Sequence, residues 1–379
     1  MKDIKLWKTV NGDSLDYLGS LADFLHNEFS QDGADKIWSK EYLEWRLSDK
    51  NPAGRGYVSY ATSDNKIVGV ATLTRKKAIL NGDNLIVAEI GDTYTLSDMI
   101  RKGKPVELSE LDSNPKSYVN KSIFGRLISE MTHRASLDGV SIIYGTPNKN
   151  TFPGYIKRLG FLNHVQYNNT VNYRPSFQLL VKKYSILKPL SKILHIVESL
   201  EFSLQRAIYS FWHGKGIKVS VDMPESDEIN ALWEETKPKV GFSLVRDSEY
   251  WHYRYTKHPL ATYKFISFRR EGSLVAISVV REFSYREGRR VSSIVELMSK
   301  DKISIGYLLA ETLNIINRRE VDYYYYYSSA TDSVSTIARG NLFLHNNPAP
   351  IVFVKNDLSI KICKNNNPFE FHLGSSDAV

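Results

Sequence analysis

Cysteine is almost absent from this chain, which has a single thiol, that of Cys363, among 379 residues. One cysteine cannot build an intrachain disulfide framework or a multi-cysteine zinc or iron–sulfur site. Long apolar runs are missing as well: no stretch reaches the roughly 20 apolar residues that span a bilayer, and the N-terminus lacks the apolar core of a signal peptide. These absences predict a cytoplasmic protein that is neither exported nor membrane-spanning.

Several familiar catalytic motifs are also missing. The sequence has no Walker-type glycine loop, no Gly-x-Ser-x-Gly and no His-Glu-x-x-His, which argues against P-loop, α/β-hydrolase and zinc-protease chemistry. The nine histidines are scattered, so we expect no metal site. A balance of 50 Lys+Arg against 42 Asp+Glu gives a net charge of +8, which is modest and typical of an ordinary soluble surface.

The chain does contain enough apolar surface to fold. Hydrophobic residues make up 42% of it and aromatic residues 12%, which is too much for a disordered polymer, because such side chains bury enough area to offset the entropy of ordering. A length of 379 residues favours two domains at about 100–200 residues each.

An internal repeat supports this division. Residues 40–46 read KEYLEWR and residues 248–254 read SEYWHYR, so that Glu, Tyr and Arg recur at a spacing of 208. Each copy continues into two extended runs joined by a polar turn, at residues 64–65 in the first copy and 271–272 in the second. This pattern is typical of a β-hairpin. We therefore expect two units of the same fold.

The repeated element itself allows two interpretations. Tyr42, Trp45 and Arg46 fall on one face of a helix, as do Tyr250 and Arg254, because residues three and four apart are neighbours on a helix surface. The element either belongs to the architecture that both copies share or contacts a substrate.

A helical pattern followed by a buried strand completes each copy. The helical patterns begin at Ser122 and Ser304. The distance from Arg46 to Ser122 is 76 positions and that from Arg254 to Ser304 is 50, so the first copy is longer by 26 residues. Residues 96–120, rich in turn-forming residues, are the candidate insertion. A loop of this length is either functional or disordered.

The segment between the copies is predicted to be a basic amphipathic connector. In residues 175–216, leucine, isoleucine and valine recur with helical spacing beside several lysines, and Pro189 interrupts the pattern. Its apolar face either packs between the two domains or, over residues 179–212, lies on an anionic membrane surface. The second alternative would place the protein at the inner face of the membrane.

Four segments of the first half resemble the successive motifs of the GNAT acyltransferase superfamily. They are residues 88–95 (AEIGDTYT), 118–127 (YVNKSIFGRL), 143–148 (IYGTPN) and 155–161 (YIKRLGF). The resemblance covers most of residues 1–170, and residues 217–355 resemble a degenerate GNAT domain. In particular, the chain resembles the tandem-GNAT proteins associated with bacterial polysaccharide biosynthesis.

This resemblance implies an α+β fold of two tandem GNAT-like domains, each a mostly antiparallel mixed sheet flanked by helices. The predicted limits are residues 1–174 for a catalytic N-terminal domain, 175–216 for the helical connector, 217–360 for the degenerate C-terminal domain and 361–379 for a polar, frayed tail.

The resemblance also implies acetyl-CoA, or another acyl-CoA, as co-substrate. Its pantetheine arm would lie along the fourth strand, residues 85–95, where that strand splays from residues 141–144. Its pyrophosphate would sit on backbone N–H groups at the start of the following helix. Val119, Ser122 and Phe124 depart from the Arg-x-x-Gly-x-Gly/Ala sequence usual at this turn. The predicted contacts are Ile90, Gly91, Lys121, Ser122, Ile123, Arg126 and Asn148.

The family mechanism is direct attack of an amine on the thioester, assisted by a base and an acid. The candidate bases are Asp92, which we favour, and Glu89. They are three residues apart, so both can line one cleft only if a bulge intervenes. The candidate acid is Tyr155, although it precedes Gly160 by five residues rather than the four that are common in the family.

Three hypotheses for function follow. The leading one is an acyl-CoA-dependent N-acetyltransferase that modifies an amino sugar, nucleotide-linked or lipid-linked, in surface polysaccharide biosynthesis, with no nucleic-acid partner. The second is an aminoacyl-tRNA-dependent transferase of the Fem type, for which the positive charge would serve the RNA backbone. The third is a catalytically inactive GNAT-like binding protein.

Overall fold

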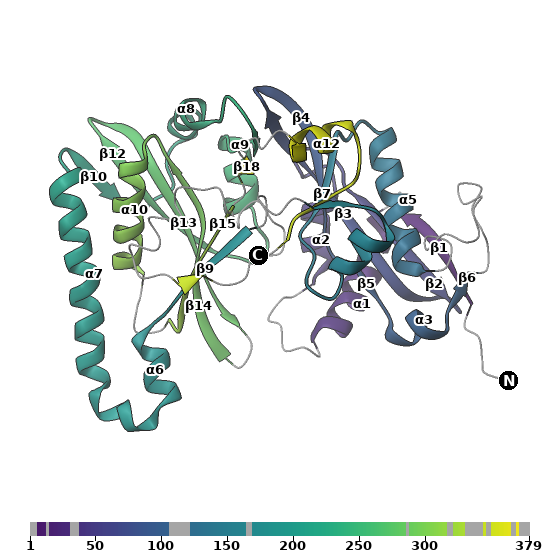
Figure 1. The fold of residues 1–379 in the computed structure, drawn as a ribbon, viewed down its shortest axis with the longest axis horizontal. Coiled ribbons are helices and arrows are strands. Elements are labelled where there is room, and N and C mark those ends of the chain that lie inside the picture. Colours follow the sequence, from purple (N-terminus) through teal and green to yellow (C-terminus); the bar gives the residue numbers. More distant parts are fainter. Residues whose placement is uncertain are drawn as a thin grey trace.

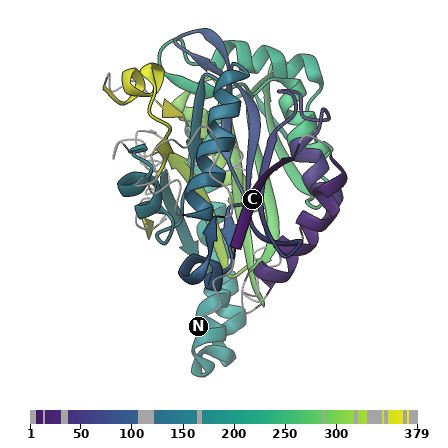
Figure 2. The ribbon, with the colours of Figure 1, turned by 90° about the vertical axis from the view of Figure 1, so that its right-hand side faces the viewer.

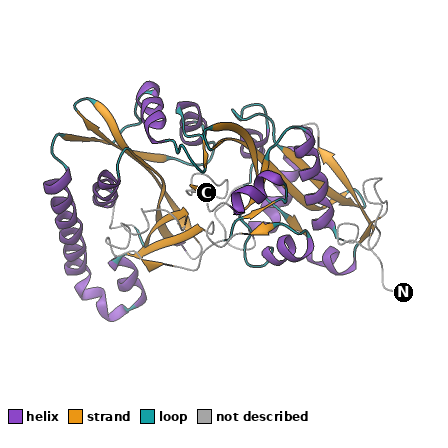
Figure 3. Cartoon of the chain, turned by 45° about the horizontal axis from the view of Figure 1, so that its top comes forward, coloured by secondary structure: helices purple, strands orange, loops and turns teal. Residues whose placement is uncertain are grey.

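A computed structural model describes residues 6–12, 15–30, 38–105, 122–163, 169–285, 288–316, 321–329, 344–345, 350–364 and 369–370. Two mixed, mostly antiparallel sheets lie side by side and helices cover them (Figures 1 and 3). The α+β class expected from the sequence is confirmed.

The first sheet has the order β6-β1-β2-β3-β4-β7-β17-β8, with β5 and β11 paired to β3 and β18 paired to β11. Helices α1, α2, α3, α5 and α12 belong to this half. The strands are β1 Leu6–Gly12, β2 Tyr57–Ser63, β3 Lys66–Leu80, β4 Asp83–Ile90, β5 Tyr94–Thr95, β6 Lys104–Pro105, β7 Ile142–Gly145, β8 Leu162–Asn163, β11 Phe242–Leu244, β17 Val352–Phe353 and β18 Phe369–Glu370. The helices are α1 Leu18–Ser30, α2 Lys40–Leu47, α3 Ser97–Lys102, α5 Ile123–Leu137, a π-helical turn Gly154–Arg158 and α12 Asp357–Lys364.

The second sheet has the order β10-β12-β13-β14-β15-β9-β16. Its strands are β9 Asn169–Pro175, β10 Ile217–Ser220, β12 Tyr263–Arg270, β13 Ser273–Tyr285, β14 Arg289–Ser299, β15 Tyr323–Ser329 and β16 Leu344–His345. The helices of this half are α6 Phe177–Lys183, a 3-10 helix Ser185–Leu190, α7 Ser191–His213, α8 Ser226–Thr236, α9 Ser248–Trp251, a π-helical turn His252–Thr256 and α10 Lys302–Ile315.

The repeat appears as two similar units. Both predicted hairpins form, β2–β3 and β12–β13. Their two-residue turns have positive φ at Asp64 and Asn65 in one copy and at Glu271 and Gly272 in the other. Positive φ at both turn residues matches the twist of the flanking strands. The helical pattern predicted from Ser122 is α5, and Ser122 caps it by accepting a hydrogen bond from the Gly125 N–H.

The two units exchange strands, which the predicted domain limits did not include. β9, from the chain just after the first unit, lies between β15 and β16 of the second sheet. β17, close to the end of the chain, lies between β7 and β8 of the first sheet. The limits drawn at residues 174 and 217–360 therefore do not coincide with the sheets, because each sheet contains a strand from the other half of the chain.

The halves meet at an approximate two-fold axis that passes through the repeated helical element. Trp45 and Tyr253, which are 208 residues apart, stack with ring centroids 4.7 Å apart. The Trp45 indole N–H donates to the Tyr253 carbonyl (3.2 Å), and the Tyr253 hydroxyl donates to the Trp45 carbonyl (2.8 Å). Reciprocal contacts between equivalent residues are what a two-fold relation produces. The repeated element thus has an architectural role.

The two faces of the first sheet have different coverings. Helix α5 packs on the face that carries Ala71, Leu73, Ala88 and Ile90. On the opposite face, α1 and α2 cover one end of the strands, while Ala78, Leu80 and Val87 pack with β11 and β17 at the other end. Polar side chains from β3 and β4 lie on this opposite face.

The connector does not pack between the two units. After the 3-10 helix that contains Pro189, α7 runs along the outer side of the second half, beside α10 and far from the first half (Figure 1). The interpretation that places its apolar face between the domains is wrong. Within the described ranges, no helix combines the length and the apolar character that crossing a membrane requires.

Two further expectations changed. The tail was expected to be frayed, yet β18 within it pairs with β11. In the candidate insertion, α3 and β6 are formed, and β6 pairs in parallel with β1. Residues 106–121, which include Lys121 and Val119, lie outside the described residues.

Candidate functional site

The candidate site begins where β4 ends. β4 and β7 pair in parallel up to Ile90 and Gly145, and beyond that point the chain after β4 turns to β3 instead, through β5. Ile90 lies opposite Leu73, whereas Tyr94 lies opposite Val70. Residues 91–93 therefore face only two residues of β3, which is a one-residue bulge.

The bulge brings the two predicted bases to one face of the sheet. Asp92 forms a hydrogen-bonded ion pair with Arg46 of α2. Arg46 also donates to Thr72 (3.3 Å) and Thr74 (3.2 Å), and Thr74 is the cross-strand neighbour of Glu89. Glu89 and Asp92 are three residues apart and could share one face only if a bulge intervened, and the structure has that bulge.

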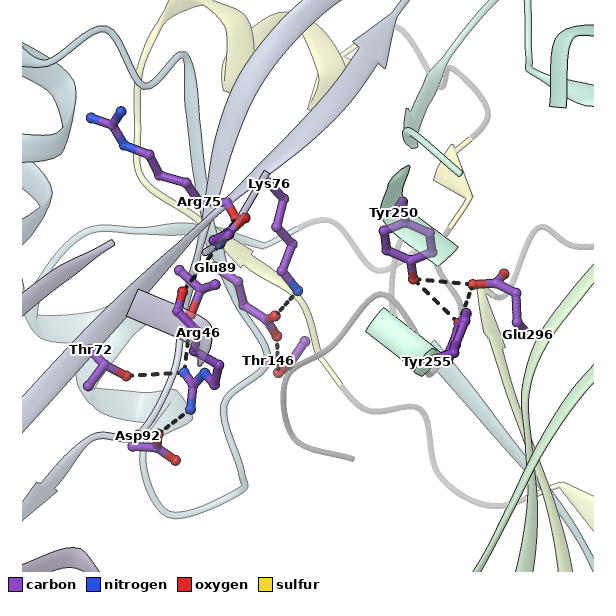
Figure 4. A network of polar contacts seen from close by, with 12 residues as sticks. Arg46, Thr72, Arg75, Lys76, Glu89, Asp92, Thr146, Tyr250, Tyr255 and Glu296 are labelled. Atoms are coloured by element: carbon purple, nitrogen blue, oxygen red, sulfur yellow. Dashed lines mark hydrogen bonds and ion pairs between the residues drawn. The ribbon is translucent and has the colours of Figure 1, made fainter. Parts of the chain in front are cut away.

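Glu89 lies at the buried end of this polar face. Its side chain is 2% exposed and forms a 2.6 Å ion pair with the Lys76 ammonium, which is 12% exposed. The Thr146 hydroxyl donates to its other oxygen at 3.4 Å. Figure 4 shows Glu89 between these two partners. The Lys76 charge offsets the cost of burying the carboxylate.

Gly91 is required by the close approach of Arg46. A Cβ at this position would lie 2.3 Å from Nη2 of Arg46 and 2.9 Å from the Thr72 hydroxyl. Any other residue would displace the guanidinium, so the glycine and the Arg46–Asp92 pair belong to one arrangement. Arg46 is 1% exposed and Asp92 7%, so the ion pair is buried. Removing either partner leaves an uncompensated buried charge and lowers the stability of the fold.

Tyr155 reaches the same bulge from the π-helical turn. The Leu159 N–H donates to the Gly154 carbonyl, five residues earlier, and such a turn holds one residue more than an α-helical turn. The extra residue before Gly160 is accommodated there. Burial raises the pKa of the Tyr155 phenol to about 12, and a hydrogen bond with Thr93 opposes part of this shift. The phenol therefore stays protonated at neutral pH.

Most predicted co-substrate contacts have partners within the protein. Ser122 is the N-cap of α5, and buried Ile123 packs against the core beneath it. Arg126 is buried and donates to Glu130 at 2.7 Å. The Asn148 side chain accepts from the N–H groups of Asn150 (2.9 Å) and Thr151 (3.0 Å).

These four residues thus have structural partners, and a role in binding CoA is not needed to explain them. Ile90 and Gly91 lie where β4 and β7 part. Lys121 belongs to the residues outside the description.

The second half has a similar bulge. Val280 lies opposite Ile294 and Val279 opposite Glu296, so Val295 is the additional residue. Counted from the two hairpins, Ile294 corresponds to Ile90 and Glu296 to Asp92. Glu89 corresponds to Ser293, which carries no charge.

Glu296 is fully buried and lies in a polar cluster. It pairs with Arg246 at 3.2 Å and accepts hydrogen bonds from Tyr255 (3.0 Å) and Tyr250 (3.4 Å). Burial raises the pKa of this carboxyl, while the charge of Arg246 lowers it. Burial, and then the charge of Glu296, raises the pKa of both phenols. Figure 4 shows this cluster across from Glu89.

Two cavities lie between the halves, and the smaller one borders the site. A small cavity of about 40 Å³ is lined by Thr74 and Lys76 from the first half and by Tyr250 and Arg254 from the second. This space holds a few water molecules, not a sugar. A larger cavity of about 470 Å³ lies between the β3–β4 hairpin and α8, and none of the predicted site residues lines it.

Sequence reasoning missed the partners of the two carboxylates. Arg46 was singled out only as part of the repeat, and Lys76 and Thr146 were not singled out. One signal was present: Thr72, Thr74 and Lys76 share one face of β3, although Arg75 and Lys77 make the other face polar at the same place. Alternating polar residues mark one face of a strand.

Comparisons with known proteins support the fold. No protein-family profile matches the sequence, and no curated protein does. Among solved structures, the chain is similar to a GCN5-related N-acetyltransferase from Anabaena variabilis, with 10% identity and a TM-score of 0.56 over 91% of this chain and 72% of that one.

It is also similar to Saccharomyces cerevisiae N-myristoyltransferase with bound myristoyl-CoA, with 11% identity and a TM-score of 0.57 over 92% and 82%. A conserved protein of unknown function from Enterococcus faecalis V583 gives 10% identity and a TM-score of 0.54 over 92% and 71%. The chain therefore has the fold of GNAT-type acyltransferases over nearly its whole length.

Proposed function

We propose that this protein is an acyl-CoA-dependent N-acyltransferase whose site lies at the end of β4 in the first half. The observation that carries the proposal is the bulge at Gly91–Thr93. It lies where β4 parts from β7 and is flanked by the Glu89 carboxylate and the Tyr155 phenol. A solved structure of similar fold binds myristoyl-CoA, which supports an acyl-CoA as the donor.

In this proposal the amine nitrogen attacks the thioester carbonyl carbon, the carbon–sulfur bond breaks, and CoA leaves as a thiolate. The proton lost by the amine goes to Glu89 as general base. Glu89 is favoured over Asp92 because Asp92 is already paired with the buried Arg46. The carboxylate at the corresponding position of the second half, Glu296, is also paired with an arginine.

Tyr155 would act as a hydrogen-bond donor to the leaving sulfur. With a pKa of about 12, its phenol is protonated whenever the enzyme works. A thiol of ordinary pKa, about 8.5, is a stronger acid, so complete proton transfer from Tyr155 to the thiolate is uphill. Stabilisation of the developing charge by a donated hydrogen bond needs no such transfer.

For the acceptor we propose an amino sugar, nucleotide-linked or lipid-linked, as in surface polysaccharide biosynthesis. The support is the resemblance of the four sequence segments to tandem-GNAT proteins of that context. One fold hosts many functions, so the fold does not identify the acceptor. The acceptor is therefore tested with a panel of amine substrates.

The test has two stages. A thermal-shift titration with acetyl-CoA, longer acyl-CoAs and free CoA should raise the melting temperature, since a ligand at 100 times its Kd stabilises a fold by about 2.7 kcal/mol. Release of free CoA thiol is then measured with amino sugars and with simple primary amines. A shift with acyl-CoA and thiol release only with an amine present is the expected result.

Two outcomes would replace the proposal. No stabilisation by any acyl-CoA, together with binding to RNA that weakens steeply with salt, would favour transfer from aminoacyl-tRNA. No stabilisation and no RNA binding would favour a binding protein without catalysis, an alternative that the ion pairs of both carboxylates and the small volume of the cavity beside Lys76 also suggest.

A further inference from the structure

Helix α7 is docked with its polar side inward. Phe202 and Tyr209 are its apolar contacts with the core of the second half, and Gly306 of α10 lets Tyr209 approach closely. Ion pairs accompany these contacts: Glu201 pairs with Arg174 and Arg206 with Glu311, both at 2.6 Å.

The apolar side of α7 faces away from the protein. Eight large apolar side chains of this helix are between 47% and 80% exposed: Ile193, Ile196, Val197, Leu200, Leu204, Ile208, Phe211 and Trp212. Ile193, Leu200, Leu204 and Phe211 follow the helical period and form the centre of this surface. From Ile193 to Phe211 it extends about 27 Å at 1.5 Å per residue. We call these eight residues the α7 apolar face.

This arrangement is the reverse of an ordinary surface helix, which buries its apolar stripe. Soluble monomers rarely expose a contiguous apolar patch larger than a few hundred Å². Figure 2 shows that the α6–α7 hairpin also protrudes from the body of the protein. At its tip, Ile186 is 82% exposed and Leu190 46%.

The charge around this face has one sign. Lys183, Lys188 and Lys192 are exposed on the hairpin that leads into α7. Between residues 177 and 212 the sequence has only two acidic residues, Glu198 and Glu201. Glu198 is 1% exposed and Glu201 pairs with Arg174. The exposed surface of the hairpin is therefore apolar and basic.

We propose that the α7 apolar face lies in the interface of an anionic lipid bilayer, with the lysines of the hairpin at the headgroups. Such an interface binds a helix that presents aliphatic and aromatic side chains bordered by basic residues. Ile196 and Ile208 lie about 120° apart around the helix, so the face is wider than the seam of a two-stranded coiled coil.

The distribution of charge also favours a bilayer over a second copy of the chain. A second copy packed in parallel on this face would bring the lysines of both hairpins together, and no exposed carboxylate of the hairpin would compensate. A bilayer with anionic headgroups supplies the missing negative charge.

The experiment uses the full chain and vesicles of phosphatidylcholine containing about a quarter phosphatidylglycerol. The protein should sediment with these vesicles at about 50 mM salt, bind pure phosphatidylcholine vesicles weakly, and be released from the anionic ones at about 0.5 M salt. The double variant Leu200→Gln/Leu204→Gln should need at least about ten times more lipid for half-maximal binding, because two apolar side chains are removed.

A matched control is available in the first half. Ile100 is 70% exposed and Leu137 73%, so Ile100→Gln/Leu137→Gln removes the same amount of exposed apolar surface and should leave lipid binding unchanged. A melting temperature measured without lipid shows that both double variants fold.

Tryptophan fluorescence gives a second measurement. Trp212 is 70% exposed, whereas the other five tryptophans are 7% exposed or less. Emission should shift to the blue when anionic vesicles are added, and this shift should disappear in Trp212→Phe. Neither measurement depends on acyl transfer.

The proposal is overturned by any of three results. They are no sedimentation with anionic vesicles at low salt, equal lipid binding by the two double variants, or a stable dimer in solution that Leu200→Gln/Leu204→Gln dissociates while vesicles bind neither form. The last result would assign the α7 apolar face to a second copy.

Discussion

The two halves share a bulge in the same place and differ in the charges around it. In both, a carboxylate at the bulge pairs with a buried arginine: Asp92 with Arg46, and Glu296 with Arg246. Only the first half has a carboxylate before the bulge, Glu89, whose counterpart is Ser293.

This difference separates architecture from chemistry. The paired carboxylate at the bulge is common to both copies and is explained by the fold, although its arginine comes from different positions: the repeat matches Arg46 with Arg254, not with Arg246. A buried charge present in one copy has no such explanation. It must be offset by its own partner, Lys76, so Glu89 is the residue whose presence points to a function.

The largest expected effect concerns the exchange of strands, which makes the two halves one cooperative unit. Phe353 is fully buried in the first sheet although it comes from the end of the chain. Phe353→Ala should lower the free energy of unfolding by about 3–5 kcal/mol and keep a single calorimetric transition.

The control is Phe268→Ala, a fully buried residue of the second sheet, which should lower the same transition. Two resolved transitions, of which Phe353→Ala moves only one, would mean that the halves unfold independently.

The next effect tests the unequal carboxylates. Glu89→Gln should lower kcat by about 10² or more, since general-base catalysis contributes at least that factor, with acyl-CoA affinity nearly unchanged. Asp92→Asn should act mainly on the melting temperature, because it leaves Arg46 buried beside a neutral partner. If folded Asp92→Asn loses as much turnover as Glu89→Gln, the assignment of Glu89 to catalysis and of Asp92 to stability is wrong.

A smaller effect is expected at Tyr155. Tyr155→Phe should lower kcat by roughly tenfold, the loss of one hydrogen bond to a developing charge. Since its pKa is raised to about 12, ionisation of this phenol should cause no fall in rate between pH 7 and about pH 10. Tyr144→Phe, at a buried residue of β7, is the control. A high-pH limb that Tyr155→Phe abolishes would contradict the assignment.

The smallest effect concerns Glu228 of α8, whose counterpart on α1 at the repeat spacing of 208 is the uncharged Ser20. Glu228 accepts two hydrogen bonds from Arg269, at 2.6 and 2.7 Å, and this pairing lowers the pKa of its carboxyl below the usual 4.5. The stability it contributes is present above the unfolded-state pKa and is lost as pH falls through the lowered folded-state value.

Glu228→Gln should therefore lower the free energy of unfolding by no more than about 1 kcal/mol at pH 7. At an acid pH below the lowered folded-state pKa of this carboxyl, the variant and the parent protein should be equally stable. Urea unfolding at the two pH values measures both differences, and an equal loss at both would show that the charge is not the cause.

Much of each unit could be predicted from the sequence, because hairpins, caps and helical periods depend on neighbouring residues. The turns at Asp64-Asn65 and Glu271-Gly272 formed as predicted, and Ser122 caps α5. The exchange of β9 and β17 could not be predicted. β17 is only two residues long and carries almost no local pattern, and the place of either strand depends on which sheet has an open edge.

The site was predicted less completely. The spacing of Glu89 and Asp92 indicated that a bulge would be needed to bring them together, but no sequence pattern indicates which cations approach them. Arg46 comes from a helix and Lys76 from the neighbouring strand. The first contact joins elements 46 residues apart, and the second depends on the register of the β3–β4 hairpin.

The sequence by itself determined the repeat, the α+β units and the amphipathic character of the connector, because composition and period act locally. Only the tertiary structure decided which way that connector turns. Buried Arg174 and Glu311 of the second half bind the polar side of α7, so its apolar side is left at the surface. Periodicity alone contains no information about which side of a helix finds a partner.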